Sequence, residues 1–369
     1  MTLVAPGRTV GIGLACAKGS MSELPMFCVD WGQRGLVGKL GRLLALLRTG
    51  YAPSLPINEE RRLKAFLRQH RVTAILAEFG TSGCALRSFC KRTGIKLFVN
   101  FHGHDATVLG QRPHMRFAYR LLAKDADGII CGSRHFSEIV EDLGFPRRKI
   151  SIIPCGVETD TFRTDVPKDM KRVVAVGRLT RKKRPDLAIR AFAHAHAKDL
   201  SLRLDIIGDG DQRDACETVI RELNVENAVT LHGAQPHSFV KDLVAKAGLF
   251  VQHSMTAENG DQESQGISLI EAMASGLPVV TTDHNGFSET VIDGETGLLS
   301  PEGDVAAMAN NLSELARDTE RARRFGAAGR ARVEARYDAE VVSKQLASLV
   351  IGTQQSTIGH DTSLCEPRL

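Results

Sequence analysis

The sequence predicts an α/β protein of two doubly wound, parallel-sheet domains that face each other across a cleft. The chain has 369 residues, which is more than one compact core usually holds. Short apolar runs rich in β-branched residues alternate with longer amphipathic stretches, as they do in βαβ units. A polar stretch near residues 157–170 interrupts this alternation, and the same pattern then starts again. Each repeat of the pattern predicts one Rossmann-like domain.

The first predicted domain covers residues 1–157. Its strands are expected at Val72–Glu78, Lys96–Phe101, Gly128–Cys131 and from Ile150 into a Pro/Gly turn. Helices are expected at Glu59–Arg71 and His135–Leu143. A further helix at Gly38–Arg48 combines five leucines with basic residues. It fits either a core-packing helix or a helix on a membrane surface.

The second predicted domain covers residues 158–351. Its strands are expected at Arg172–Val176, Arg203–Ile207, Ala228–Leu231, Leu249–Val251, Pro278–Thr282 and Gly297–Ser300. A helix-rich end runs from Val305 to Leu349, and its last helix, about residues 336–351, is a candidate to pack back on the first domain. Residues 352–369 are polar and without periodicity, so we expect a disordered tail. In such folds ligands bind at the carboxyl ends of the strands.

Composition excludes several classes of protein. The net charge of +5 suits contact with phosphates or an anionic membrane, but the basic residues are scattered and not interleaved with aromatic residues, so no nucleic-acid partner is predicted. The eight cysteines form no CxxC pair, which predicts free thiols in a reducing compartment and no metal site. We see no secretory signal and no apolar run near the roughly 20 residues of a membrane helix. A cytoplasmic protein is expected, with peripheral membrane contact as an open alternative.

The strongest chemical signal is the segment of residues 263–280, ESQGISLIEAMASGLPVV. Its apolar spacing predicts a helix from Ile267, so Gly266 and Ser268 lie at a helix N-terminus, where free N–H groups favour a diphosphate. Glu263 comes just before this turn and Glu271 one helical turn after it. Two carboxylates would repel a bare phosphate, so the pair indicates a ligand that also carries hydroxyl groups.

The Glu-x7-Glu spacing with Ala-Met-Ala-Ser-Gly-Leu-Pro-Val-Val after it resembles the signature of the retaining glycosyltransferases of family 4, which have the GT-B fold. The resemblance runs from about Val72 to about Asp338 and is to bacterial exopolysaccharide and colanic-acid-type members. It implies transfer of a sugar from a nucleoside-diphosphate sugar to a saccharide or lipid-linked acceptor in cell-surface polysaccharide biosynthesis. It implies neither cofactor nor metal ion. In that family Glu271 would hold the nucleotide ribose and Glu263 the transferred sugar.

Three further elements extend the resemblance in the second half. In Val-Gly-Arg178-Leu-Thr-Arg-Lys-Lys183, Arg178 and Lys183 would bind the donor diphosphate and stabilise it as it leaves. Gly208 and Gly210 would let the backbone approach the nucleotide, and His232 would lie near the base. Gly266, Ile267 and Ser268 would complete the donor site. The rest of the basic run, Arg181, Lys182 and Arg184, is expected to be solvated.

In the first half, Phe101-His102-Gly-His-Asp105 resembles the "Phe-His-Gly-x-Asp" element of exopolysaccharide-type members. By resemblance His102 joins Glu263, Arg178 and Lys183 in the catalytic set, and Asp105 orients groups on the acceptor side. Glu78 stands where a histidine is usual in relatives. Glu289 is expected to be structural, and residues 254–262 to form a sugar-contacting loop.

Two other functions stay open. The resemblance is poor over the first 70 residues, where Gly11-Ile-Gly13 is the one candidate for the family's Gly-Gly loop. A protein that binds a nucleotide sugar without turnover would fit such a trimmed first domain. Another GT-B enzyme, an epimerase or a phosphorylase, is the second alternative.

Overall fold

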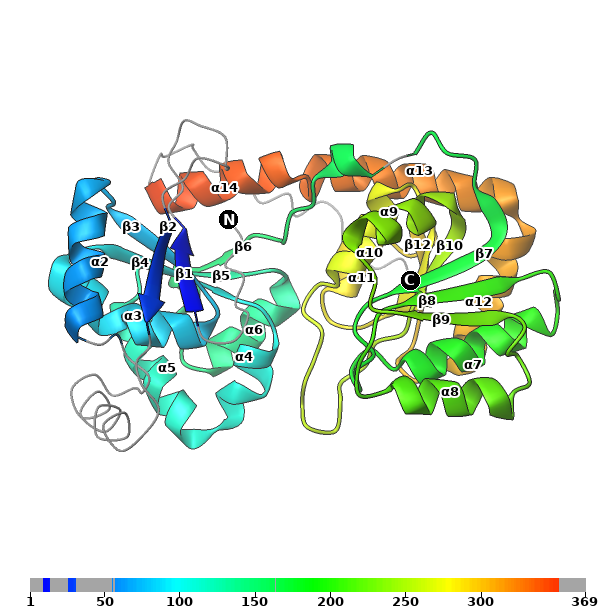
Figure 1. Cartoon of the computed structure of the whole chain (residues 1–369), viewed down its shortest axis with the longest axis horizontal. Helices are drawn as coiled ribbons and strands as arrows, with labels where there is room; N and C mark the ends of the chain where they lie inside the picture. The colour runs from blue at the N-terminus through cyan, green and yellow to red at the C-terminus, as the bar shows by residue number, and fades with distance from the viewer. Residues whose placement is uncertain (1–8, 14–25, 31–54, 56, 163, 352–369) are drawn as a thin grey trace, which may run out of the picture.

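The computed structural model describes residues 9–13, 26–30, 55, 57–162 and 164–351, and two α/β domains follow one another along the long axis of the molecule (Figure 1). The helix predicted at residues 38–48 and the tail predicted at residues 352–369 lie outside the described residues.

The first domain is built on a four-stranded parallel sheet of order β3-β4-β5-β6. The strands are β3 (Ala74–Glu78), β4 (Lys96–Phe101), β5 (Gly128–Cys131) and β6 (Ile150–Ile152). Around them lie α2 (Ile57–Gln69), α3 (Gly80–Thr93), α4 (His104–Thr107), η2 (Leu109–Gln111), α5 (Pro113–Asp125), α6 (Arg134–Asp142) and η3 (Arg147–Lys149). A separate antiparallel pair joins β1 (Thr9–Gly13) to β2 (Met26–Asp30). The strands predicted here are confirmed, and the described sheet is wound in one direction.

The second domain is built on a six-stranded parallel sheet of order β12-β11-β10-β7-β8-β9. The strands are β7 (Asp169–Val176), β8 (Arg203–Ile207), β9 (Val229–Gly233), β10 (Ala247–Gln252), β11 (Val279–Thr282) and β12 (Gly297–Ser300). The helices are η4 (Thr159–Thr161), α7 (Pro185–His196), α8 (Arg213–Glu222), α9 (His237–Lys246), α10 (Ile267–Ala274), α11 (Phe287–Thr290), α12 (Val305–Arg317) and α13 (Thr319–Arg336). The strand order reverses between β7 and β10, which is the doubly wound arrangement that places a ligand at that point.

Burial on both faces explains the continuous apolar strands of this sheet. Every residue of β10 is buried. One core packs α7 and α12 against the sheet through residues such as Phe192 and Leu312, and the other packs α10 and α13 through Ile270 and Val333. Because helices cover both faces, the ligand-accessible part of the domain is the edge formed by the strand ends.

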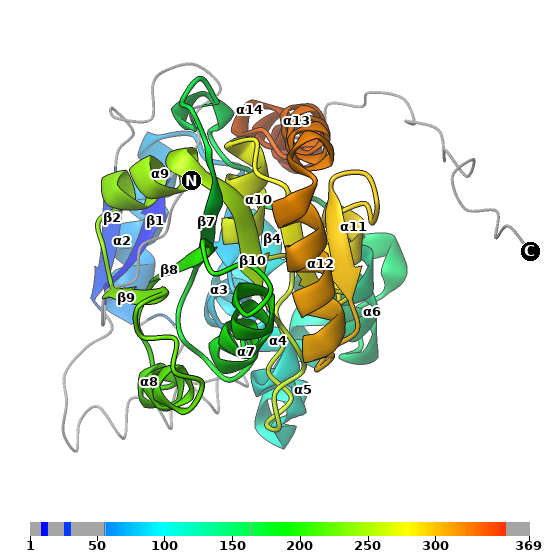
Figure 2. The same ribbon diagram turned by 90° about the vertical axis from the view of Figure 1, so that its right-hand side faces the viewer.

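The last helix, α14 (Ala339–Ile351), extends from the second domain to the first, in line with α13 along the top of the molecule (Figure 1 and Figure 2). Its Val342 is buried in one cluster with Phe98 and Ile130 of the first sheet. The chain passes between the domains twice, near Val157 and near Ala339, and hydrogen bonds join these two segments. Val157 donates its N–H to the Tyr337 carbonyl, and the Val157 carbonyl accepts the Ala339 N–H. Within the described part of the chain, each helix is too short or too polar to span a bilayer.

Candidate active site

An ion pair joins Lys183, from the loop after β7, to Glu263, from the loop after β10. The Lys183 Nζ lies 3.1 Å from the Glu263 carboxylate, and the two side chains are 15% and 16% exposed. Burial alone would raise the pKa of Glu263, but the charges of Lys183 and Lys182 outweigh it and hold the pKa below its ordinary value. Glu263 is therefore ionised and can accept hydrogen bonds from hydroxyl groups.

The N-terminus of α10 is open, as the sequence predicts. Gly266 is the N-cap residue of α10, with a φ of 74°, and as a glycine it has no side chain to accept a hydrogen bond from the first N–H groups of the helix. A Cβ at Gly266 would lie 2.7 Å from the Phe287 ring, so glycine is required both by the backbone angle and by space. Ile267 is 50% exposed, and the Ser268 hydroxyl donates to Gln252 at 2.9 Å. This helix start can receive an anionic group.

Glu271 lies one turn into α10 and faces α9. Burial raises the pKa of Glu271, while the charge of Lys241 opposes that shift. Its Oε1 lies 3.9 Å from His237 Nε2, and its side chain is 20% exposed. A partly shielded carboxyl group at this depth is suited to bind hydroxyl groups of a ligand that enters along α10.

Gly208 and Gly210 hold the loop after β8 directly against the loop after β7. A Cβ at Gly208 would lie 1.9 Å from the Gly177 oxygen, and one at Gly210 would lie 2.3 Å from the Leu179 oxygen. The Leu179 N–H donates to Asp209 across this contact. The two glycines thus shape the turn that carries Arg178, whose side chain is exposed.

His232 is tied to the sheet beneath it. Its Nε2 lies 2.6 Å from Asp205, and the same carboxylate lies 3.0 Å from Arg172. The ring also packs near Phe239, with centroids 5.4 Å apart. These contacts fix the ring at the end of β9 and leave it 21% exposed.

The expectation that the whole basic run beside Lys183 is solvated was wrong for Lys182. Lys182 is 7% exposed, and its Nζ donates to Asp261 and to the Gln262 carbonyl. It is buried because the long loop after β10 folds over it. Arg184 is partly buried and bonded to Asp186, whereas Arg181 stays exposed.

In the first domain, His102 is paired with Glu78, the residue that stands where a histidine is usual in relatives. His102 Nε2 lies 2.5 Å from the Glu78 carboxylate, and Asn100 donates to the same oxygen at 3.1 Å. Burial alone would lower the pKa of His102, but hydrogen bonds with Cys155 and Glu78 raise it to about 10. The imidazole is therefore cationic at neutral pH. The exposed ring of Phe79 packs on it at 4.7 Å.

Asp105 supports the loop that carries His102. Its carboxylate accepts from the N–H groups of His102 and Gly80, at 3.0 and 2.7 Å. It is 3% exposed, so its carboxylate is not available at the surface of the cleft. Its burial raises its pKa, and these backbone hydrogen bonds oppose the shift. Asp105 thus orients the backbone at His102 and Gly80 from the buried side of the loop.

Contacts between the domains bring the two halves of the site together. Ser264, next to Glu263, donates its hydroxyl to the His102 carbonyl at 3.1 Å. Gln265 is 2% exposed and accepts from the Cys155 N–H at 2.7 Å. Glu289, expected to be structural, accepts from the N–H groups at the start of α6 in the first domain. The loops of Glu263 and His102 are therefore in direct contact.

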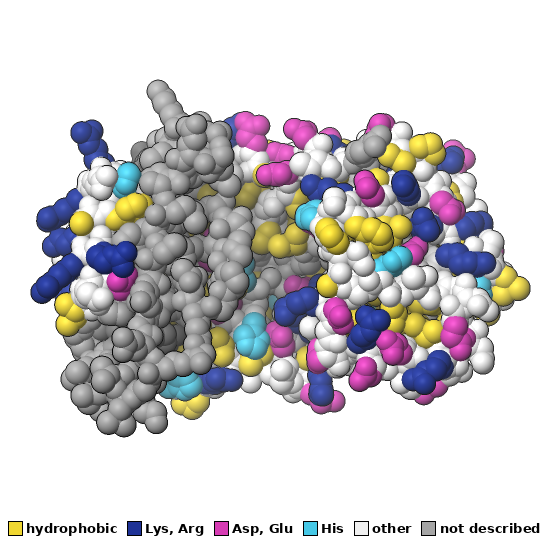
Figure 3. Space-filling model, in the orientation of Figure 1, with side chains coloured by type: hydrophobic (Ala, Val, Ile, Leu, Met, Phe, Trp, Pro, Cys, Tyr) yellow, Lys and Arg dark blue, Asp and Glu magenta, His cyan; other side chains and the backbone are white. Residues whose placement is uncertain are grey.

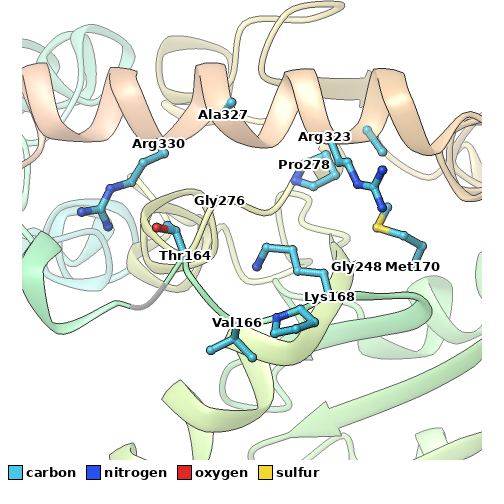
Figure 4. A pocket seen from close by; sticks show the side chains of 12 residues that line it. Thr164, Val166, Lys168, Met170, Gly248, Gly276, Pro278, Arg323, Ala327 and Arg330 are labelled. Carbon is cyan, nitrogen blue, oxygen red and sulfur yellow. The ribbon is translucent and has the colours of Figure 1, made fainter.

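One cavity lies near these elements, and a second lies away from them. One of about 580 Å³ opens at the seam between α6 and α13 and is lined by polar side chains, among them Arg134, Asn285 and Arg336. The other, of about 510 Å³, lies at the opposite edge of the second sheet, where β7 begins (Figure 4). There Lys168 donates to the carbonyls of Ala245 and Ser275, and burial lowers its pKa to about 8. The described residues contain no group of three or more His, Cys, Asp or Glu side chains that could hold a metal ion.

Comparison with known proteins identifies the two halves. Residues 37–161 match the family model Glycosyltransferase Family 4, and residues 157–332 match Glycosyl transferases group 1. WcaL of Escherichia coli, named as a colanic acid biosynthesis glycosyltransferase, is 30% identical over 76% of this chain and 70% of its own length. The amylovoran biosynthesis glycosyltransferase AmsK of Erwinia amylovora is 31% identical over 74% of this chain and 69% of its own.

Solved structures agree in fold. Anabaena HepE in complex with UDP superimposes with a TM-score of 0.67 at 21% identity, over 78% of this chain and 80% of that one. This likeness places the chain in the GT-B fold. The matches to both family models and to WcaL and AmsK show that the chain belongs to the glycosyltransferases of family 4.

Proposed function

We propose that this protein is a retaining glycosyltransferase that moves a sugar from a nucleoside-diphosphate sugar to a saccharide or lipid-linked acceptor in cell-surface polysaccharide biosynthesis. The single observation that carries the proposal is the Lys183–Glu263 ion pair beside the open start of α10. The helix start suits a diphosphate, and the carboxylates of Glu263 and Glu271 suit hydroxyl groups on either side of it. The names of WcaL and AmsK support the polysaccharide role.

In this proposal the chain supplies the positive charge that the leaving diphosphate needs. Arg178 and Lys183 would stand at the diphosphate with Gly266, Ile267 and Ser268, so the proposal requires neither cofactor nor metal ion. Glu271 would bind the ribose and Glu263 the transferred sugar. His102, held by Glu78, would contact the sugar or the acceptor hydroxyl from the first domain.

We extend the proposal to peripheral contact with an anionic membrane. Arg61, Lys64 and Arg68 are exposed on α2, and Ile57 at its start is 58% exposed. Lys and Arg side chains gather at this end of the molecule (Figure 3). A lipid-linked acceptor would be reached from such a surface. Binding to vesicles of anionic phospholipid that falls in the Arg61→Ser, Lys64→Ser, Arg68→Ser variant would support this, and equal binding would contradict it.

The donor site is tested by binding. A thermal-shift panel of nucleotide sugars first selects the donor, and calorimetry then compares wild type with Lys183→Ala and Glu271→Ala. Both variants should lose affinity while staying folded, whereas the surface controls Lys246→Ala and Glu320→Ala should not. Unchanged affinity in both site variants would contradict the site assignment. Binding without transfer or hydrolysis would favour a nucleotide-sugar-binding protein, and sugar 1-phosphate released from an oligosaccharide and phosphate would favour a phosphorylase.

A further inference from the structure

Three neighbouring strands of the second sheet end at a connected set of polar side chains. The strands β10, β11 and β12 are adjacent, and Glu263, His284 and Glu302 lie in the loops that follow them. Since β11 is the middle strand, His284 stands between the other two loops. Its side chain is fully buried.

His284 bonds to both neighbouring loops through its two ring nitrogens. Nδ1 lies 2.5 Å from the carboxylate of Glu302, and Nε2 accepts the backbone N–H of Glu263 at 3.2 Å. Asn285 donates to the Glu263 carbonyl at 3.0 Å. The backbone of Glu263 is thus held at its N–H and at its C=O by two consecutive side chains.

The direction of these bonds specifies one form of the imidazole. A backbone N–H always donates, so Nε2 must carry a lone pair, and the proton must be on Nδ1 facing Glu302. An imidazolium would direct a second N–H at the Glu263 N–H and break the contact. Burial lowers the pKa of His284, and the charge of His135 in α6 acts in the same direction. Glu302 and Glu263 oppose this shift with their negative charges. The neutral form is therefore maintained.

Glu302 also joins the far end of the same loop. Its second oxygen accepts the Thr256 N–H at 3.1 Å. The loop between Thr256 and Glu263 is therefore held at both of its ends by the Glu302–His284 pair. The pair fixes where the Glu263 carboxylate meets Lys183, although neither residue bonds to that carboxylate.

We propose that His284 and Glu302 are positioning residues, which hold Glu263 at the transferred sugar through the Nδ1–H form of the imidazole. The proposal rests on the proposed function, because it takes Glu263 to bind that sugar. A displacement of about 1 Å at a reacting centre can lower a rate roughly 100-fold. Loss of the pair should therefore lower kcat and leave binding of the nucleotide alone unchanged.

The first experiment separates positioning from simple structural support. His284→Gln and Glu302→Gln are expected to lower kcat by roughly 10- to 100-fold, with the affinity for the free nucleoside diphosphate unchanged. The matched control is His253→Gln, because His253 is equally buried in the same region and its Nε2 accepts the Gly303 N–H, away from Glu263. The control should lower the melting temperature and keep kcat. Equal kcat losses in His284→Gln and His253→Gln, or full activity in His284→Gln, would overturn the proposal.

The second experiment does not depend on activity. In protein labelled with ¹⁵N-histidine, NMR should show His284 as the Nδ1–H tautomer at neutral pH. Glu302→Gln should keep this tautomer, because the Glu263 N–H still donates to Nε2 and the amide oxygen of the glutamine can accept from Nδ1–H. An Nε2–H or doubly protonated ring in the wild type would overturn the proposal. If instead wild type transfers no sugar while this tautomer is found, the proposed function fails and the geometry of the pair stands.

Discussion

The Lys183 ammonium nitrogen lies 3.1 Å from the Glu263 carboxylate, although the two residues belong to loops far apart in the chain. They meet because β7 and β10 are neighbours at the point where the strand order reverses. Little of either side chain is exposed, so water screens the pair weakly. Each charge therefore depends on its partner.

The first prediction concerns the stability of this pair. Lys183→Met should lower the free energy of unfolding by about 3 kcal/mol, because it leaves a shielded carboxylate unpaired. The double variant Lys183→Met, Glu263→Leu should recover part of that loss. Urea denaturation of the four forms of the double-mutant cycle measures the coupling. The exposed pair Arg190–Glu222 is the control, with an expected coupling below about 1 kcal/mol. A Lys183–Glu263 coupling as small as the control would contradict the prediction.

The second prediction concerns pH and the Glu78–His102 pair. Against the effect of burial, hydrogen bonds with Cys155 and Glu78 raise the pKa of His102 from 6.5 to about 10 in the folded protein, so these contacts stabilise the fold fully below pH 6.5. That stabilisation is lost as pH rises through about 10. The melting temperature of wild type should therefore exceed that of Glu78→Gln at pH 6, and the difference should shrink steadily toward pH 10. Glu138→Gln, an exposed carboxylate, should show no such trend. A difference that grows with pH would contradict the ion pair.

The third prediction concerns the contact between the loops after β7 and β8. Gly210→Ala should displace the Arg178 turn, because its Cβ would lie 2.3 Å from the Leu179 oxygen. We expect both a lower melting temperature and a weaker affinity for the nucleotide. Gly294→Ala is the control, since φ there is +75° but no atom lies within 4 Å of the added Cβ. It should cost about 1 kcal/mol from backbone strain alone and keep nucleotide affinity. Intact affinity in Gly210→Ala would show that the turn is not set by this contact.

The fourth prediction concerns the contact of Glu289 with α6. Its carboxylate accepts the N–H groups of Arg134 and His135 at 3.0 and 3.1 Å. Glu289→Ala should speed hydrogen exchange at these two amides about tenfold, because the charge-assisted bonds at a helix N-terminus are lost. Glu295, in the turn that follows α11, is an exposed carboxylate, and Glu295→Ala should leave hydrogen exchange at both amides unchanged. Unchanged exchange in Glu289→Ala would contradict the two hydrogen bonds from α6 to this carboxylate.

Local patterns in the sequence were sufficient to predict the elements around the site. The start of α10 follows from the apolar spacing after Gly266, and its end follows from the Gly276–Pro278 stop. Both signals act within one or two helical turns. The strands β7 and β10, which precede Lys183 and Glu263, were also predicted from local patterns. Their alternation with helices was enough to predict two parallel sheets.

The side-chain pairings between strand ends could not be predicted from local patterns in the sequence. The burial of Lys182, the Glu78–His102 pair and the bonds from His284 to Glu302 and Glu263 all connect residues at the ends of different strands. The rule that strand ends share one edge indicated that these loops meet, but not which side chains bond. The sequence by itself determined where the strands and helices around the site lie along the chain, because secondary structure depends on neighbours along the chain. Only the tertiary structure decided their partners, because the strand order sets which loops are adjacent and the packing between domains sets how closely they approach.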